Sequence, residues 1–133
     1  MSVIAYSIEQ VFSWSKLSYK DKNAIKPYLL NSSTVIMPIK KNIVHKNIMG
    51  KNQTTLGIRI PHDDFCKKLS KKYMLPITTT SVNLTGTPPI NNPKKIYLHY
   101  KNKVDLLIDN GTLANSSGSK IYEIEKSTII NIR

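Results

Sequence analysis

Cysteine is nearly absent: Cys66 is the single one in 133 residues. Neither an internal disulfide framework nor a multi-cysteine zinc site is therefore available, and we expect a reducing, cytoplasmic setting. No apolar run approaches the 18 or more residues of a membrane span. The first residues, MSVIAYSIEQVF, lack the basic start of a secretory signal. The sequence thus predicts neither export nor a membrane partner.

Acidic residues are scarce as well. The chain holds 8 Asp and Glu against 20 Lys and Arg, which leaves a formal net charge of +12. All but two of the basic residues are lysines, spread from Lys16 to Lys126, and asparagine is abundant. This pattern follows either from a genome of skewed base composition or from a footprint for polyanions such as RNA or nucleotide phosphates. The second interpretation requires the lysines to converge on one face.

The length of the chain predicts one hydrophobic core. A domain of about 150 residues buries roughly two thirds of its unfolded surface, so a second independent core is not expected here. Hydrophobic residues make up 40% of the chain, which favours folding over disorder. We therefore expect a single domain over residues 1–133.

Short β-branched segments alternate with helical patterns. The expected strands are 2–6, 34–37, 55–60, 76–80, 104–108, 121–124 and 128–132. Helix starts are marked by Ser7, by Ser18 with Asp21 in the manner of a capping box, and by Pro93. Residues 40–53 show no sustained period and predict a mobile basic loop or a short hairpin. The alternation predicts an α/β fold with a twisted, mixed sheet and flanking helices.

Residues 55–80 predict a strand, a helix over 63–72 and a second strand. Pro61 ends the first strand, and the first turn of the helix is expected to hold His62, Asp63 and Asp64, where acidic groups suit the helix dipole. Three apolar residues recur at steps of four on this helix: Phe65, Leu69 and Tyr73. The connection has the length of a βαβ unit, so we expect both strands in one sheet.

Familiar catalytic signatures are missing: no Walker loop, G-x-G-x-x-G, H-E-x-x-H or G-x-S-x-G motif is present. His45, His62 and His99 are far apart in sequence, so surface positions are expected instead of a metal site. Cys66 is most simply a small buried hydrophobic residue. We assign no metal ligand and no nucleophile.

The segment TTTSVNLTG, residues 78–86, places polar side chains directly after a predicted strand. Open α/β sheets bind ligands at the carboxyl ends of their strands. Hydroxyl, amide and backbone N–H groups hold phosphate oxygens, and Gly86 lets the backbone approach a ligand closely. The alternative is a Thr-rich strand followed by an Asx-turn.

Arg59 is unusual because it is the sole arginine before Arg133 in a chain that otherwise uses lysine. A planar guanidinium binds carboxylates or phosphates through two parallel hydrogen bonds, which a lysine ammonium does not. The sequence thus predicts a need for guanidinium at this position.

Together these segments resemble a known family. TTLGIRIPHDDFCKKL followed by LPITTTSVNLTGTPP is similar to the T-x-G-x-R-x-P and T-S-A-N-x-[ST]-G-x-P signature of the YrdC-type threonylcarbamoyl-AMP synthases, in spacing as well as in residues. Upstream, SVIAYSIEQVFSW resembles the segment after the family's Lys-x-Arg motif, and SSTVIMP resembles its P-G-P-x-T-x-[IV]-L strand. Downstream, VDLLIDNGTLANSSGSKIYEI resembles its D-x-[IV]-I-D-G-G end. Val82 replaces the alanine of the central motif, and Leu30-Asn31-Ser32 replaces Pro-Gly-Pro.

The resemblance implies a twisted mixed sheet around a positively lined cavity, and a nucleotidyltransferase reaction. L-threonine, bicarbonate and ATP, with Mg²⁺ as the companion of ATP, would give threonylcarbamoyl-AMP and pyrophosphate. The product would serve to form threonylcarbamoyl-adenosine in tRNA.

Site residues follow from the same resemblance. Arg59 matches the family's cavity arginine and is the expected catalytic residue, while Ser81 and Asn83 match its nucleotide-binding serine and asparagine. Because the strand ends carrying them are predicted neighbours, these three should line one concave surface.

Further nucleotide-binding positions are implied at Thr79, which replaces a family serine, and at Thr85, before the motif glycine. Ser119 matches the serine of a late Ser-Thr pair, although Lys120 replaces the threonine; Ser127-Thr128 offers a less well-spaced alternative.

Part of the family pattern has no counterpart in these 133 residues: its N-terminal strand, its T-D-T-x-Y-G-L segment and its Lys-x-Arg motif. Two functions therefore stay open. One is a threonylcarbamoyl-AMP synthase domain, truncated at its N-terminus and completed by a polypeptide that supplies those motifs. The other is a non-catalytic nucleotide- or RNA-binding remnant of that domain.

Overall fold

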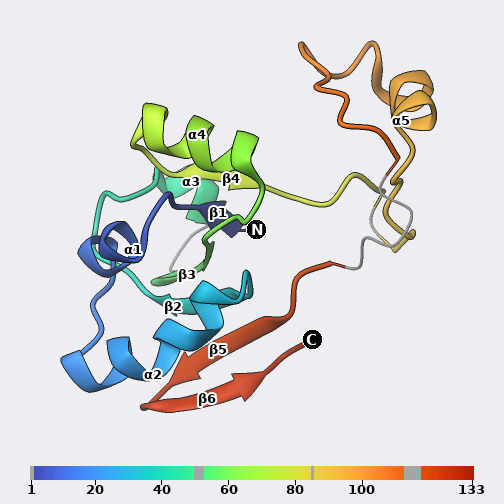
Figure 1. Cartoon of the computed structure of the whole chain (residues 1–133). Coiled ribbons are helices and arrows are strands. Elements are labelled where there is room, and N and C mark those ends of the chain that lie inside the picture. The colour runs from blue at the N-terminus through green and yellow to red at the C-terminus, as the bar shows by residue number, and fades with distance from the viewer. Residues whose placement is uncertain (1, 50–52, 85, 113–117) are drawn as a thin grey trace. The chain divides into compact units, whose positions relative to one another are not determined.

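A computed structural model describes residues 2–49, 53–84, 86–112 and 118–133. The chain forms two compact units, residues 1–79 with 119–133 and residues 80–118, which are described separately. Figure 1 shows the order of the elements along the chain. No helix in the described ranges is long and apolar enough to cross a membrane.

The first unit is built on a mixed sheet of six strands in the order β4-β1-β3-β2-β5-β6. The strands are β1 (Ser2–Ile4), β2 (Thr34–Pro38), β3 (Thr55–Arg59), β4 (Ile77–Thr79), β5 (Ile121–Glu125) and β6 (Thr128–Asn131). The β1/β3 and β2/β5 pairs are parallel, and the other pairs are antiparallel. The predicted α/β class with a mixed sheet is therefore confirmed.

Its helices are α1 (Ile8–Trp14), α2 (Tyr19–Leu30), α3 (Lys46–Met49) and α4 (Asp64–Tyr73). The serine caps lie where the sequence predicts them: the Ser7 hydroxyl accepts the Gln10 N–H at 3.2 Å, and that of Ser18 accepts the Asp21 N–H at 3.2 Å. Pro27 does not end α2, because that helix continues to Leu30.

Two details around the helices differ from the sequence prediction. Residues 46–49, expected within a loop or hairpin, form the single turn of α3. His62 lies before α4 and not in its first turn, because the Asp63 side chain is the N-cap, accepting the Cys66 N–H at 2.8 Å.

The hydrophobic core lies on one face of the sheet. Neighbouring strands supply Val3, Ile58 and Val35, which are paired in register and fully buried. Helices α1 and α2 cover this face with buried apolar side chains: Val11, Trp14, Ile25 and Leu29. Because side chains alternate along a strand, the opposite face carries the intervening residues, both polar and apolar, such as Ser2, Ile4 and Arg59.

Strands β3 and β4 share the sheet and are joined by α4, as predicted. They are not neighbours, however, since β1 lies between them. β1 runs parallel to β3 and antiparallel to β4, so β3 and β4 run in opposite directions.

The second unit contains α5 (Pro93–Tyr100), which begins with a proline at its first turn as predicted. No described residue between 80 and 118 is fully buried. The prediction of a strand at 104–108 is wrong, because this segment is not a strand in the structure. A strand needs a neighbouring strand to pair its backbone groups, and the described part of this unit contains no other strand.

Candidate functional site

The face of the sheet opposite the core carries several polar side chains. Register pairs Ser2 with Gly57 and Thr79, and Ile4 with Arg59 and Ile77. Residues paired across strands point to the same face, as do residues two apart along one strand. Arg59 and Thr79 therefore lie on one side of the sheet. We call this side the polar face. It carries Ser2, Thr34, Gly57, Arg59, Thr79 and Glu123, and between them the apolar residues Ile4, Ile36, Ile77 and Ile121.

Arg59 is the last residue of β3 and is half-buried. Its guanidinium forms no hydrogen bond or ion pair with any other residue in the described ranges. The five N–H donors of this half-buried side chain are therefore not used within the described part of the chain. Such a group suits an anionic ligand better than a fully exposed lysine, because less water competes for its hydrogen bonds.

Thr79 lies at the end of β4, and its hydroxyl is already paired. Thr79 Oγ1 lies 2.9 Å from Ser2 Oγ and donates to the Ser2 carbonyl at 3.3 Å. These contacts tie the edge strand β4 to β1. A phosphate oxygen at this hydroxyl would have to replace a bond that also stabilises the sheet.

Ser119 lies farther across the sheet, beside strand β2, and its hydroxyl is also paired. Its hydroxyl lies 2.9 Å from Thr34 Oγ1, and its carbonyl accepts Arg133 Nη2 at 3.2 Å. Thr34 is a buried residue of β2 on the polar face. Ser119 is thus brought to the same face as Arg59 and Thr79, with its hydroxyl engaged.

Ser81 and Asn83 form a compact loop in the second unit. The Ser81 hydroxyl donates to Asn83 Oδ1, and Asn83 Nδ2 donates to the carbonyls of Leu84, at 3.0 Å, and Thr87, at 2.8 Å. Gly86 has φ +84°, which an L side chain adopts only under strain. The Asn83 amide therefore holds the loop in shape; Thr85 lies outside the described residues.

The predicted meeting of Arg59 with Ser81 and Asn83 stays a prediction, because Arg59 belongs to the first unit and the other two to the second. The reason given for it is wrong. The two strands are not neighbours, since β1 lies between them, and their register places Thr79 level with Gly57, two residues before Arg59.

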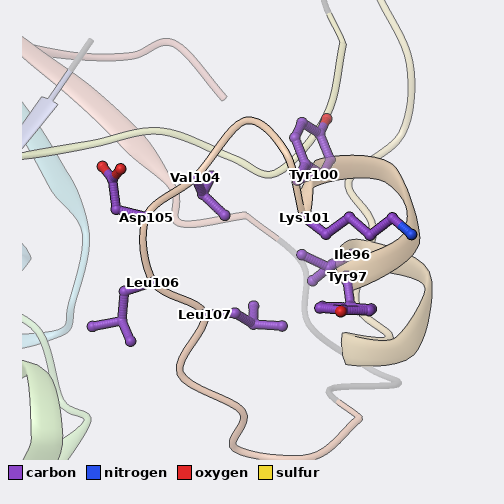
Figure 2. A pocket seen from close by; sticks show the side chains of 8 residues that line it. All are labelled: Ile96, Tyr97, Tyr100, Lys101, Val104, Asp105, Leu106 and Leu107. Carbon is purple, nitrogen blue, oxygen red and sulfur yellow. The ribbon is translucent and has the colours of Figure 1, made fainter.

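A pocket of about 130 Å³ lies in the second unit, between α5 and the segment that follows it (Figure 2). Its lining is mostly apolar: Ile96, Tyr97, Tyr100, Lys101, Val104, Asp105, Leu106 and Leu107. Ligand pockets commonly reach about 300–1,000 Å³. This pocket is too small for a nucleotide and contains no predicted site residue.

Neither a metal site nor a reactive thiol is indicated by the described residues. No three His, Cys, Asp or Glu side chains in the described ranges come together as a metal-binding group. Partial burial raises the pKa of the Cys66 thiol, and the neighbouring Asp63 adds to the effect. A thiol with a raised pKa is a poor nucleophile.

Ser2 and Thr34 are polar-face residues that the sequence interpretation missed. Each is the first residue of a short apolar strand. In the sequence alone it looks like the end of the preceding loop. Alternation could have indicated Thr34, since it and Ile36 flank Val35, but only pairing between strands places it beside Ser119.

Comparison with solved structures finds the same fold. P. abyssi Sua5 complexed with L-threonine aligns with a TM-score of 0.82 and 21% identity, over 99% of this chain and 39% of that one. E. coli YciO aligns with a TM-score of 0.83 and 20% identity, over 99% of this chain and 64% of that one.

Sequence comparison gives concordant matches. A profile of the Sua5/YciO/YrdC family, described as "Telomere recombination", matches residues 1–133. A protein of Methanocaldococcus jannaschii, which carries the name threonylcarbamoyl-AMP synthase provisionally, is 30% identical over the whole chain. The threonylcarbamoyl-AMP synthase of Photobacterium profundum is 25% identical over 73% of the chain. The matches span 61% and 51% of the lengths of these two relatives.

Proposed function

Since the chain belongs to the Sua5/YciO/YrdC family, we propose that it acts as a threonylcarbamoyl-AMP synthase domain. The proposed substrates are L-threonine, bicarbonate and ATP, and the products are threonylcarbamoyl-AMP and pyrophosphate. The names of the matched relatives support the reaction, and the complex of P. abyssi Sua5 with L-threonine supports one substrate.

The proposal rests on the surroundings of the Arg59 side chain. Its guanidinium lies on the polar face, half-buried, with no partner in the described part of the chain. All three substrates are anionic or carry a carboxylate. A guanidinium in such a position binds one oxyanion group through two parallel hydrogen bonds.

The reaction depends mainly on positioning the reactants and on neutralising their negative charge. The threonine amine attacks the bicarbonate carbon, water leaves, and a carbamate forms. A carbamate oxygen then attacks the α-phosphorus of ATP while the bond to pyrophosphate breaks. Arg59 would hold an anionic group of the reactants and offset its charge, and hydroxyl and backbone N–H groups would fix the nucleotide.

Mg²⁺ would enter with ATP, because it coordinates phosphate oxygens. The described side chains do not supply a cluster of carboxylates or histidines that fits a protein-held metal ion. No protein ligand to magnesium is therefore assigned.

The proposal is tested by incubating the chain with ATP, L-threonine and bicarbonate and measuring pyrophosphate. Release should require all three substrates and fall at least about tenfold in Arg59→Met, in line with the loss of a charge-assisted hydrogen bond. Lys16→Met, which likewise removes one positive charge but at an exposed position, should leave the rate unchanged. The assay is repeated with a polypeptide that carries the family's Lys-x-Arg and T-D-T-x-Y-G-L segments.

Calorimetric titration with ATP separates the two functions that the sequence leaves open. Binding without pyrophosphate release, even with the added polypeptide, would favour the non-catalytic nucleotide-binding remnant. Absence of both binding and release would contradict the proposal.

A further inference from the structure

Two loops of the first unit meet where β2 begins and β3 ends. Thr34 is the first residue of β2 and Arg59 is the last residue of β3. Because these strands are antiparallel, both residues lie at the same end of the sheet. Residues 31–33 lead into β2 at this end, and residues 60–63 leave β3 toward α4.

Two side chains cross between these loops in opposite directions. His62 Nε2 lies 2.8 Å from the Leu30 carbonyl oxygen, and the Ser32 hydroxyl donates to the Ile60 carbonyl at 3.3 Å. Because a carbonyl only accepts, Nε2 of His62 carries the hydrogen in the first bond. We call these two bonds the loop clamp. Each loop thus supplies one side-chain donor to a backbone carbonyl of the other or of the helix end beside it.

His62 satisfies the open end of α2. The last carbonyls of a helix have no partner within the helix. The Tyr28 carbonyl accepts the N–H groups of Asn31 and Ser33, which closes the helix in the manner of a Schellman motif. The Leu30 carbonyl is taken by His62. A side chain from the loop after β3 therefore caps a helix that ends 32 residues before it.

Ser32 occupies a backbone position that suits glycine better. Its φ is 53°, in the left-handed region, which residues with a Cβ adopt at a cost. It directly follows Asn31, the C-cap of α2, where glycine is the usual residue. What serine supplies here and glycine does not is the hydroxyl bond to Ile60.

The described contacts hold Arg59 through its backbone. Its carbonyl accepts the Ala5 N–H at 3.0 Å, and the next carbonyl, that of Ile60, accepts the Ser32 hydroxyl. The guanidinium itself has no hydrogen bond or ion pair in the described ranges. Its direction therefore depends on how firmly the chain around Arg59 is fixed. A displacement of about 1 Å at a reacting group costs roughly a hundredfold in rate.

We propose that Ser32 and His62 are positioning residues for Arg59. The loop clamp fixes residues 60–63 against the end of α2 and so keeps the guanidinium directed at the anionic group of the reactants. Its effect on the reaction rests on the function proposed above. Residues 30–32, which replace Pro-Gly-Pro, lack the fixed φ of proline, and the clamp supplies the restraint in its place.

Ser32→Gly separates positioning from folding. Glycine relieves the positive φ while the hydroxyl bond is lost, so the midpoint of urea unfolding should change little. The kcat for pyrophosphate release should nevertheless fall about three- to tenfold, the range of one hydrogen bond. Asn42→Gly is the matched control, since Asn42 also has a positive φ, 66°, but follows the other end of β2. It should leave both quantities unchanged.

Variants of His62 test the second bond. His62→Ala should lower kcat by a similar factor, and His62→Gln, whose side-chain amide donates to the same carbonyl, should restore part of the loss. His99→Ala on α5 is the control, because it removes another histidine–carbonyl bond, from Nδ1 to Lys95 at 2.9 Å. It should retain full kcat.

Selective ¹⁵N labelling of arginine gives a readout without substrate, since the chain has two arginines, Arg59 and Arg133. In Ser32→Gly and His62→Ala, the backbone and Nε signals of Arg59 should shift and their heteronuclear NOE should fall. The signals of Arg133 should not change.

Unchanged Arg59 signals in both variants would overturn the proposal, and so would altered signals with an unaffected kcat. Altered Arg59 signals in a chain that releases no pyrophosphate even when unmutated would confirm that the clamp positions Arg59. That outcome would contradict the proposed function alone.

Discussion

The hydroxyl groups of Ser2 and Thr79 lie 2.9 Å apart and join β1 to the edge strand β4. Their contact places on the polar face a threonine that the family resemblance assigns to nucleotide binding. The same hydroxyl therefore has a structural role in the sheet beside its expected role in nucleotide binding. A substitution can separate these two roles.

Thr79→Val removes the hydroxyl but keeps the size and the β-branching of the side chain. We expect the free energy of unfolding to fall by about 1 kcal/mol, because the bond to the Ser2 carbonyl and the pairing with the Ser2 hydroxyl are lost. Urea unfolding measures the change. Thr78→Val is the control, since Thr78 is exposed on the other side of the strand. Equal stability of both variants would contradict the structural role.

Arg59→Lys keeps the positive charge and loses the planar fork. The affinity for threonine or ATP should fall by at least about 1 kcal/mol, or roughly fivefold, because one of two parallel hydrogen bonds is lost. The midpoint of urea unfolding should change little, since the guanidinium has no partner in the described ranges. Isothermal titration calorimetry decides the question, and unchanged affinities for both ligands would rule out Arg59 as a binding residue.

Asn83→Asp keeps the acceptor for Ser81 and removes the amide donor to the Leu84 and Thr87 carbonyls. The loop should lose its fixed shape, so ATP affinity should fall while threonine affinity stays the same. Titration with each ligand measures both effects. Asn92→Asp, a change of amide to carboxylate at the N-cap of α5, serves as the control because aspartate caps a helix as well as asparagine does. Full ATP affinity in Asn83→Asp would remove Asn83 from the nucleotide site.

Asp63 should make stability depend on pH. Its carboxylate accepts the Cys66 backbone N–H, and this bond lowers the pKa of Asp63 below its ordinary value. A lowered folded-state pKa means that the stabilisation is present above the unfolded pKa, about 3.9, and is lost as the pH falls through the folded value. The stability difference between the unmutated chain and Asp63→Asn should therefore shrink between pH 6 and about pH 2. Asp64→Asn is the control, and urea unfolding across this range that shows a constant difference for Asp63→Asn would contradict the assignment.

Two adjacent leucines in α2 test which face of this helix packs against the core. Leu29 is fully buried and Leu30 is 53% exposed. Leu29→Ala should lower the free energy of unfolding by about 2–5 kcal/mol, because it removes buried methyl groups and leaves a cavity. Leu30→Ala should cost much less. Similar losses at both positions would show that α2 packs differently.

Much of the secondary structure was predictable because its signals are local. Ser7 and Ser18 satisfy N–H groups three residues ahead, and a β-branched run such as 34–37 favours a strand wherever it lies. The segment at 104–108 has the same local character and is not a strand, because a strand also needs a neighbour that local sequence does not supply.

The sequence by itself determined the helix caps, the α/β class, the family signature and the choice of Arg59 as an unusual residue. Only the tertiary structure decided that β1 lies between β3 and β4, that Arg59 and Thr79 share the polar face, and that the Thr79 and Ser119 hydroxyls are engaged by Ser2 and Thr34. The physical reason is that caps and propensities depend on residues a few positions apart. Strand order, direction and hydroxyl pairing depend on contacts between segments more than 50 residues apart in the chain.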